Sequence, residues 1–241
     1  MIELLPFRSV HVDLVLTDHA AALAKRDQYL PLLSPEERER MARFVFERDR
    51  VRFLLTRALA RTTLSRYAPV APADWHFIAN AHGRPEILDR PAGVPDLRFN
   101  LSHTDGLIAC AVTIGREVGI DVEHVGRRLT QDVAARFFAP AEVAHLQSLP
   151  AVQQERAFFD YWTMKEAYIK ARGLGLALPL GDFAFQFAPD RPPTITIEPS
   201  LQDDPATWQF QQDWPTPIHR LGLAVRRTGD DLPVRLRQVV P

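Results

Sequence analysis

Apolar residues recur along this chain at two spacings, which predict two kinds of element. In the stretch 158–173 they return every three or four residues, as on one face of a helix. Gly173 stands where a left-handed C-cap would end that helix. A second helical pattern begins at Ser34 with a capping box and continues to about Tyr67. A third occupies 129–150 and contains a proline that breaks it.

Strands are predicted where apolar and polar residues alternate, or where a short apolar run lies between turn residues. The sequence V-H-V-D-L-V-L alternates, whereas L-I-A-C-A-V-T-I is a continuous apolar run. The predicted strands are 10–16, 75–78, 107–114, 118–125, 194–197, 208–210 and 221–225, with a turn entering a further strand at 173–180. Neither an internal repeat nor a low-complexity linker divides the sequence.

Composition narrows the class of protein. The 241 residues are 46% apolar and 24% charged, and the net charge of −1 gives no overall attraction to nucleic acid or an anionic membrane. The single cysteine, Cys110, lies inside a predicted strand and is expected to be a small buried hydrophobe. The sequence shows no leader pattern and no apolar run that would cross a membrane, so we expect a cytoplasmic protein.

Two acidic residues share one face of the strand predicted at 118–125. The alternation of this strand places Asp121 and Glu123 together, opposite Ile120 and Val122. One interpretation is an exposed edge strand with its carboxylates in water. The other is a site for a hard cation such as Mg²⁺, which prefers carboxylate oxygens and leaves positions for water and phosphate. A third carboxylate would favour the second interpretation.

The helix predicted at 158–173 presents a glutamate and a lysine on one side. Glu166 and Lys170 are four residues apart, and Trp162 lies one turn earlier. They could form an ordinary ion pair on a solvated face. However, the chain has three lysines against twenty-six arginines, which suggests that Lys170 is needed as a compact ammonium. Lys165 projects from a different side, so its replacement by arginine is expected to be silent.

Arginine is concentrated in the second helical pattern. From Glu36 to Arg66 there are nine arginines and five acidic residues, which is either a solvated face or a phosphate-binding surface. The turn H-G-R-P presents Arg84, and F-N-L-S-H places Ser102 and His103 at the entrance of a strand. Neighbouring residues on a strand point to opposite faces, so the serine and histidine are not a hydrolase pair. Nucleophile elbows, P-loops and dinucleotide or zinc motifs are missing from the sequence.

Three motifs in order, F-N-L-S-H, G-I-D-V-E and F-F-x-x-W-x-x-K-E-A-x-I-K, resemble the Sfp-type 4′-phosphopantetheinyl transferases. The resemblance extends from about Ser34 to Leu180 and is weak at the first strand and over the last sixty residues. It implies an enzyme that moves the phosphopantetheine arm of coenzyme A onto a serine of an acyl or peptidyl carrier protein. It also implies a pseudo-duplicated α+β fold of two subdomains, with coenzyme A and Mg²⁺ in the cleft between them.

The resemblance assigns roles to particular residues. The implied metal ligands are Asp121, Glu123 and Glu166, and Lys170 is implied to lie against the reacting phosphate. For the proton of the carrier serine, Glu166 is the first candidate base, directly or through a metal-bound water, and Glu123 is the second. The residues implied to surround the nucleotide and its 3′-phosphate are Arg48, Arg52, Arg84, Asn100, Ser102 and His103.

Two positions depart from the family pattern. Phe53 stands where some members carry a hydroxyl that contacts the 3′-phosphate. Glu37 stands where some members have a lysine, which would leave Arg40 and its neighbours to bind that phosphate.

The expected organisation is an N-terminal subdomain at 1–114, on the nucleotide side, and a C-terminal subdomain at 115–241 with the metal site and catalytic helix. We expect a monomer that releases 3′,5′-ADP and acts on an apo carrier protein of unspecified pathway. Two alternatives remain open. One is a metal-dependent phosphohydrolase that uses the same carboxylates on water, and the other is a non-catalytic module that binds coenzyme A or a carrier.

Overall fold

The computed structural model describes residues 9–126 and 131–241, which divide into two compact units. Unit 1 contains the described residues up to Arg116 together with Leu232–Pro241, and unit 2 contains those of Glu117–Asp231. The sequence led us to expect subdomains at 1–114 and 115–241. The last ten residues belong instead to unit 1, because their strand pairs with the first strand of the chain.

Unit 1 is built on a four-stranded sheet in the order β11-β1-β5-β4. Its central strand β1 runs antiparallel to β5 and parallel to β11. The strands are β1 (Val10–Leu16), β4 (Leu97–His103), β5 (Leu107–Ile114) and β11 (Val234–Gln238), and a separate hairpin is formed by β2 (His76–Ala79) and β3 (Pro85–Leu88). The predicted role of Cys110 is confirmed, since its thiol is fully buried in β5.

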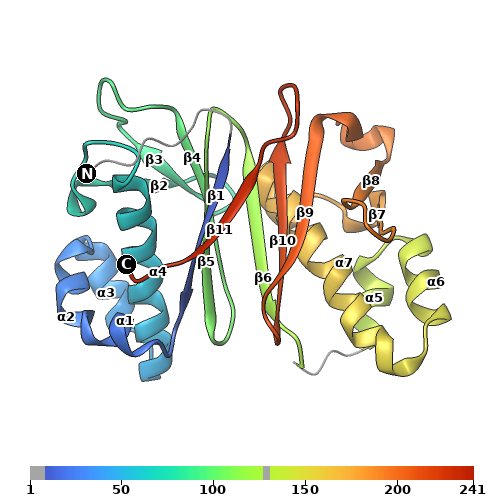
Figure 1. Cartoon of the computed structure of the whole chain (residues 1–241), viewed down its shortest axis with the longest axis horizontal. Coiled ribbons are helices and arrows are strands. Elements are labelled where there is room, and N and C mark those ends of the chain that lie inside the picture. Colours follow the sequence, from blue (N-terminus) through green and yellow to red (C-terminus); the bar gives the residue numbers. More distant parts are fainter. Residues whose placement is uncertain (1–8, 127–130) are drawn as a thin grey trace. The chain divides into compact units, whose positions relative to one another are not determined.

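The predicted helix from Ser34 to Tyr67 forms as two helices. The first, α3 (Pro35–Ala42), begins with the expected capping box, in which the Ser34 hydroxyl accepts a 3.2 Å hydrogen bond from the amide of Glu37. The chain is extended at Phe46 before α4 (Glu47–Ser65) begins. Helix α4 packs on the sheet of unit 1 (Figure 1), and two short helices, α1 (Ala20–Ala24) and α2 (Arg26–Tyr29), precede them.

A buried ion pair ties β11 to β1 in unit 1. Asp13 is fully buried, and its carboxylate accepts a 2.8 Å hydrogen bond from Nε of Arg237 and a 2.9 Å hydrogen bond from the hydroxyl of Thr63. Arg237 also donates to the hydroxyl of Tyr67 at 2.6 Å. These contacts explain why the end of the chain completes unit 1.

Unit 2 repeats the plan of one sheet and one long helix. Its three-stranded sheet has the order β6-β10-β9, and β7 and β8 form a separate hairpin. The strands are β6 (Val118–His124), β7 (Phe183–Gln186), β8 (Thr194–Ile197), β9 (Trp208–Thr216) and β10 (His219–Arg226). The stretch 173–180, expected to enter a strand, contains a short 3₁₀ turn, and β7 begins only at Phe183.

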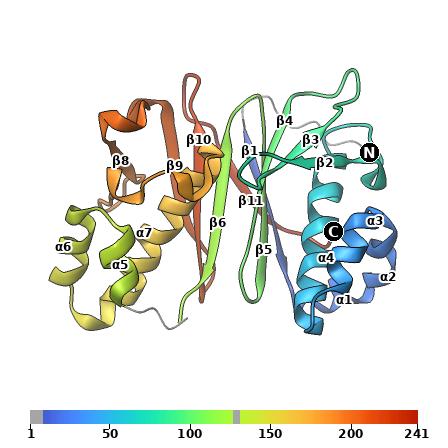
Figure 2. The ribbon, with the colours of Figure 1, turned by 180° about the vertical axis from the view of Figure 1, so that it is seen from behind.

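The helices of unit 2 are α5 (Gln131–Phe137), α6 (Pro140–Ser148) and α7 (Ala151–Arg172). The helix predicted at 129–150 is thus interrupted before Pro140, and residues 129 and 130 lie outside the described part of the chain. In both views α7 lies between the β6-β10-β9 sheet and the pair α5 and α6 (Figures 1 and 2). The predicted α+β class is therefore confirmed.

Two glycines allow α7 to approach the sheet of unit 2 closely. A Cβ built on Gly119 of β6 would lie 2.0 Å from the carbonyl oxygen of Ala167, and one built on Gly222 of β10 would lie 2.5 Å from that of Thr163. No larger residue fits at such a separation without moving the helix. These contacts therefore set the position of α7 relative to β6 and β10.

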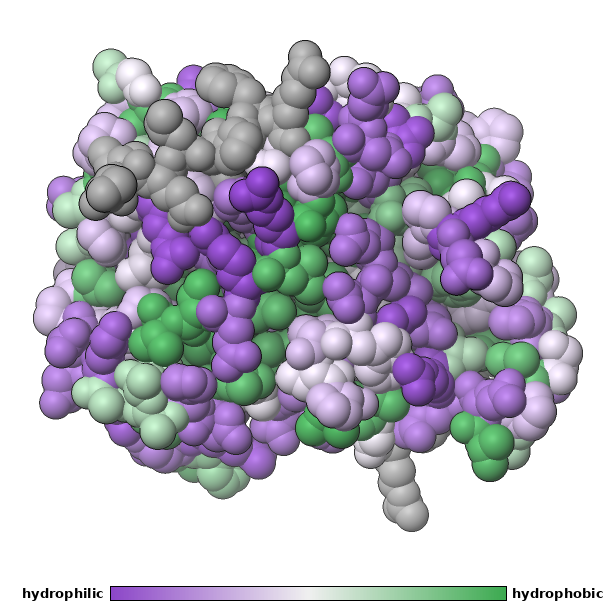
Figure 3. Space-filling model, viewed as in Figure 1, coloured by the Kyte–Doolittle hydropathy of each residue, from purple (hydrophilic) through white to green (hydrophobic). Residues whose placement is uncertain are grey.

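The described residues include no helix long and apolar enough to cross a membrane. On the face drawn in Figure 3, hydrophilic and hydrophobic residues are interspersed.

Candidate active site

Strand β6 carries two carboxylates toward α7. Lys170 on that helix donates a 2.6 Å hydrogen bond to Oδ1 of Asp121, and the indole nitrogen of Trp162 donates to Oε1 of Glu123 at 3.2 Å. Both carboxylates thus lie on one face of the strand, as the alternation predicted. The side chain of Asp121 is only 6% exposed, so it is not a carboxylate in open water.

Glu166 is the third carboxylate of this cluster. It projects from α7 one turn before Lys170. Burial and, after it, the negative charges of Asp121 and Glu123 raise the pKa of Glu166 to about 7, against the opposing effect of the Lys170 ammonium. The residues therefore share one electrostatic environment, in which three acidic groups outnumber one cation. Lys170 pairs with the strand carboxylate, and this pairing differs from the helix-face ion pair with Glu166 considered from sequence alone.

The cluster has the donor chemistry of a hard-cation site. All three acidic groups offer oxygen ligands, and a bound dication would offset the repulsion that raises the pKa of Glu166. Among the described residues, no three His, Cys, Asp or Glu side chains form a group that could hold a metal ion. Mg²⁺ commonly takes one or two carboxylates and completes its coordination with water and substrate phosphate, so the donor set fits this cation.

The expectation that arginine could replace Lys165 silently does not agree with the surroundings of this side chain. Its side chain is 0% exposed, and Nζ lies 2.7 Å from Oε2 of Glu142. The same ammonium donates to the carbonyl oxygens of Leu180 and Phe183, both at 2.7 Å. A guanidinium is too large for this satisfied buried site, so Lys165 cannot serve as a silent control. The large apolar residues on either side of it in the sequence were the available signal of burial.

The candidate nucleotide-binding arginines of α4 make local contacts. Arg52 pairs with Asp49 at 2.7 Å, and the Arg48 guanidinium lies 5.4 Å from the centroid of the Phe46 ring. Arg48 is exposed and Arg52 half-buried. Part of the positive charge predicted for this segment is therefore compensated within α4 itself.

The two positions that depart from the family pattern both contact Arg57 in unit 1. Glu37 accepts a 2.8 Å hydrogen bond from Arg61 and lies 3.4 Å from Nε of Arg57. Phe53 has the guanidinium of Arg57 at 5.0 Å and that of Arg40 at 5.7 Å from its ring centroid. Glu37 thus neutralises cations instead of adding one, and Phe53 stacks with cations instead of offering a hydroxyl.

The remaining candidates lie on β4 and beside it. Asn100 and Ser102 are buried on one face of β4, and His103, on the other face, is exposed. Arg84 lines a cavity of about 220 Å³ with Arg90 and Arg98, among other residues. The structure thus brings Asp121, Glu123, Glu166 and Lys170 together in unit 2, and the nucleotide candidates are distributed over α4, β4 and the β2-β3 turn of unit 1.

Comparisons with known proteins agree with these motifs. Residues 117–219 match the family model described as the 4′-phosphopantetheinyl transferase superfamily, and residues 22–114 match that of the 4′-phosphopantetheinyl transferase N-terminal region. The chain is 40% identical over 171 residues to the 4′-phosphopantetheinyl transferase HetI of a Nostoc species, which covers 70% of each chain. It is 32% identical over 183 residues to the 4′-phosphopantetheinyl transferase Sfp of Bacillus subtilis, covering 76% of this chain and 79% of Sfp.

Proposed function

The chain belongs to the 4′-phosphopantetheinyl transferase superfamily, and we propose that the cluster of Asp121, Glu123, Glu166 and Lys170 carries out the transfer. The protein is an enzyme that transfers the phosphopantetheine arm of coenzyme A to a carrier protein. The observation that carries the assignment to this cluster is the 2.6 Å contact between Lys170 and Asp121, beside a glutamate that is electrostatically coupled to both.

The proposed reaction is a displacement at phosphorus. The hydroxyl oxygen of the carrier serine attacks the β-phosphorus of coenzyme A, forming a new P–O bond. The bond from that phosphorus to the bridging oxygen breaks, and 3′,5′-ADP leaves with the electron pair. The serine proton must pass to a base, and the transferred phosphate becomes a diester that joins the serine to pantetheine. Glu166 is the proposed base, and Glu123 is the second candidate.

A divalent cation, proposed to be Mg²⁺, completes the site. Asp121, Glu123 and Glu166 would hold it through carboxylate oxygens, and it would supply electrostatic stabilisation for the charge that develops on the diphosphate. The excess of negative charge around Glu166 supports this assignment.

Lys170 is proposed to neutralise the same developing charge. Its ammonium lies against Asp121 in unit 2, with 27% of the side chain exposed, so it is positioned by the protein and accessible to a ligand. A lysine offers a compact point charge that can approach one crowded oxygen. Stabilisation that strengthens as charge develops accelerates the chemical step itself.

The nucleotide end of coenzyme A is proposed to bind unit 1. The proposed contacts are Arg48, Arg52, Arg84, Asn100, Ser102 and His103. Arginine suits the 3′-phosphate because its planar fork of donors matches phosphate oxygens. We also propose a cytoplasmic monomer, and its single buried cysteine fits a reducing compartment.

Transfer is tested directly by incubating the protein with coenzyme A, Mg²⁺ and a panel of apo carrier proteins, followed by intact-mass measurement. The expected result is a carrier that gains the phosphopantetheine arm, with 3′,5′-ADP released in equal amount. Asp121→Ala should abolish this gain while the protein remains folded. Phosphate release from simple esters without any carrier modification would identify a phosphohydrolase instead.

A further inference from the structure

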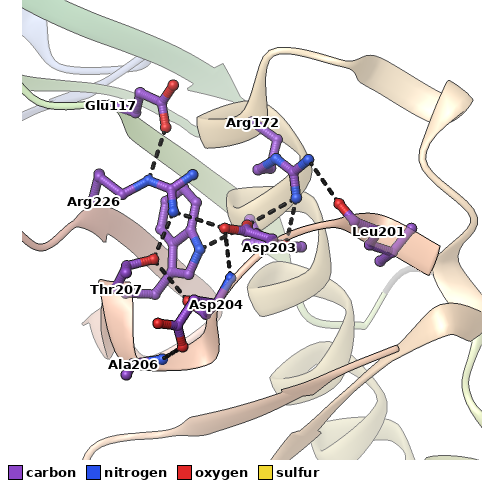
Figure 4. Close-up of polar contacts among 10 residues, drawn as sticks. Glu117, Arg172, Leu201, Asp203, Asp204, Ala206, Thr207 and Arg226 are labelled. Carbon is purple, nitrogen blue, oxygen red and sulfur yellow. Dashed lines mark hydrogen bonds and ion pairs between the residues drawn. The ribbon is translucent and has the colours of Figure 1, made fainter. Parts of the chain in front are cut away.

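The buried carboxylate of Asp203, near the C-terminal end of α7, accepts several hydrogen bonds. The side chain of Asp203 is 4% exposed and lies in the segment before β9. Figure 4 shows Arg172 and Arg226 reaching its carboxylate from two elements. Oδ2 accepts from the Tyr168 hydroxyl at 2.7 Å, Nη1 of Arg172 at 2.8 Å and Nε1 of Trp208 at 2.9 Å, and Oδ1 accepts from Nη1 of Arg226 at 2.7 Å and the amide of Asp204 at 3.0 Å.

These donors come from three different elements of unit 2. Tyr168 and Arg172 belong to the last two turns of α7, Trp208 begins β9 and Arg226 ends β10. The guanidinium of Arg226 also stacks on the Trp208 ring at 4.0 Å. One carboxylate therefore fixes the C-terminal end of α7 to the ends of two strands of the sheet.

That end of α7 also carries the reactive side chains. Tyr168 stands midway in sequence between Glu166 and Lys170, and it points to another side of the helix because successive residues are rotated by about 100°. A helical turn is stiff, so a shift of the Tyr168 backbone moves both neighbours. Gly173 ends the helix in a left-handed conformation directly afterwards, and the last turn therefore has no further helix to hold it.

We propose that Asp203 is a positioning residue for the transfer reaction, acting through Tyr168 and Arg172 to hold Glu166 and Lys170 against Asp121. The inference rests on the roles proposed above for Glu166 and Lys170. The hydrogen-bond partners of Asp203 on α7 are Tyr168 and Arg172, so its effect on Glu166 and Lys170 would pass through the helix. Its carboxylate is the shared acceptor of four side-chain donors, two of them guanidiniums that would repel each other without it.

The test compares Asp203→Asn with a matched change in unit 1. The asparagine keeps the size of the side chain, but its amide group would turn N–H donors toward donors that are already present. Asp13→Asn is the control, because Asp13 is a fully buried carboxylate that also accepts from an arginine and a hydroxyl, and it belongs to unit 1, whereas α7 belongs to unit 2. Both variants should lose thermal stability.

Three readouts separate positioning from general stability, all taken well below the unfolding temperature of each variant. They are kcat and KM for coenzyme A, the Mg²⁺ concentration that gives half-maximal rate, and amide hydrogen exchange over 166–173. For Asp203→Asn we expect kcat to fall about tenfold or more, since misplacement by 1 Å can cost about a hundredfold. The KM for coenzyme A should be nearly unchanged, the Mg²⁺ requirement should rise, and exchange over 166–173 should accelerate.

Asp13→Asn should change none of these three readouts. If Asp203→Asn does not fold, Tyr168→Phe removes a single hydroxyl from the network and should produce the same pattern at smaller amplitude. Wild-type kcat in the folded variant, or exchange over 166–173 no faster than in Asp13→Asn, would overturn the positioning role. Absence of transfer by the wild-type protein would instead overturn the proposed function, and hydrogen exchange would still report whether Asp203 holds this turn.

Discussion

The close approach of α7 to Gly119 leads to a specific prediction about how the fold supports the transfer reaction. In Gly119→Ala the new Cβ would lie 2.0 Å from the Ala167 carbonyl oxygen and 2.3 Å from the Ala171 amide nitrogen. Ordinary contact begins near 3.4 Å, and both neighbours are backbone atoms that cannot rotate away. The helix must therefore recede from β6 by more than about 1 Å, a misplacement that can reduce the rate about a hundredfold.

The same substitution should lower stability as an overpacked core does, by about 1–3 kcal/mol. The assay combines thermal unfolding with the kcat of transfer measured while the variant is folded. Gly222→Ala, whose Cβ would lie 2.5 Å from the Thr163 carbonyl oxygen, should behave alike. Gly181→Ala is the control, because a Cβ there meets no atom within 4 Å. If Gly119→Ala matches Gly181→Ala in both stability and kcat, α7 does not depend on this close approach.

Four further predictions follow from individual contacts. Lys170→Arg should lose most of its kcat with little change in coenzyme A affinity, because the larger guanidinium must displace Asp121 or substrate; unchanged kcat would make the lysine incidental. Arg52→Ala should weaken coenzyme A about tenfold, matching the loss of a charge-assisted bond of about 1.5–3 kcal/mol, and should spare dephospho-coenzyme A; equal losses would assign this arginine to the Asp49 pair alone. Lys165→Met should cost about 3–5 kcal/mol of stability by leaving Glu142 buried and unpaired, and Lys165→Met with Glu142→Leu should recover part of that loss in thermal unfolding. Burial opposes ionisation of Asp203, but hydrogen bonds from Arg226, Tyr168 and Trp208 prevail and hold its pKa below the usual 3.8. The stability that the ionised carboxylate contributes is therefore present above pH 3.8 and lost as the pH falls through the lowered pKa. The melting temperature of Asp203→Asn should accordingly fall less in acid than that of the wild type.

The sequence predicted which side chains share a face of an element better than it predicted where the elements begin and end. Alternation in β6 correctly placed Asp121 and Glu123 on one face, because a side-chain period of two follows from strand geometry alone. In the same way, helix geometry predicted that Glu166 and Lys170, which are four residues apart, project from one side of α7. The break at Phe46 was missed, because the apolar spacing continues through it.

Contacts between residues far apart in the sequence could not be predicted from local sequence patterns. Lys165 is paired with Glu142 and with two carbonyl oxygens that it meets only after the chain turns back, so local spacing could not identify these partners. Residues 232–241 belong to unit 1 because Arg237 pairs with Asp13, which lies more than two hundred residues earlier in the sequence. The glycines of β6 and β10 were visible in the sequence, but only the packed helix explains them.

The assignment of the carboxylate cluster is tested most directly by a crystal structure with coenzyme A and Mn²⁺, in which anomalous scattering locates the ion. We predict one anomalous peak within coordination distance of carboxylate oxygens of Asp121, Glu123 and Glu166 and of a coenzyme A phosphate oxygen, with Lys170 turned to the diphosphate. A peak elsewhere, or carboxylates of Asp121 and Glu166 too far apart to share the ion, would contradict the proposed mechanism.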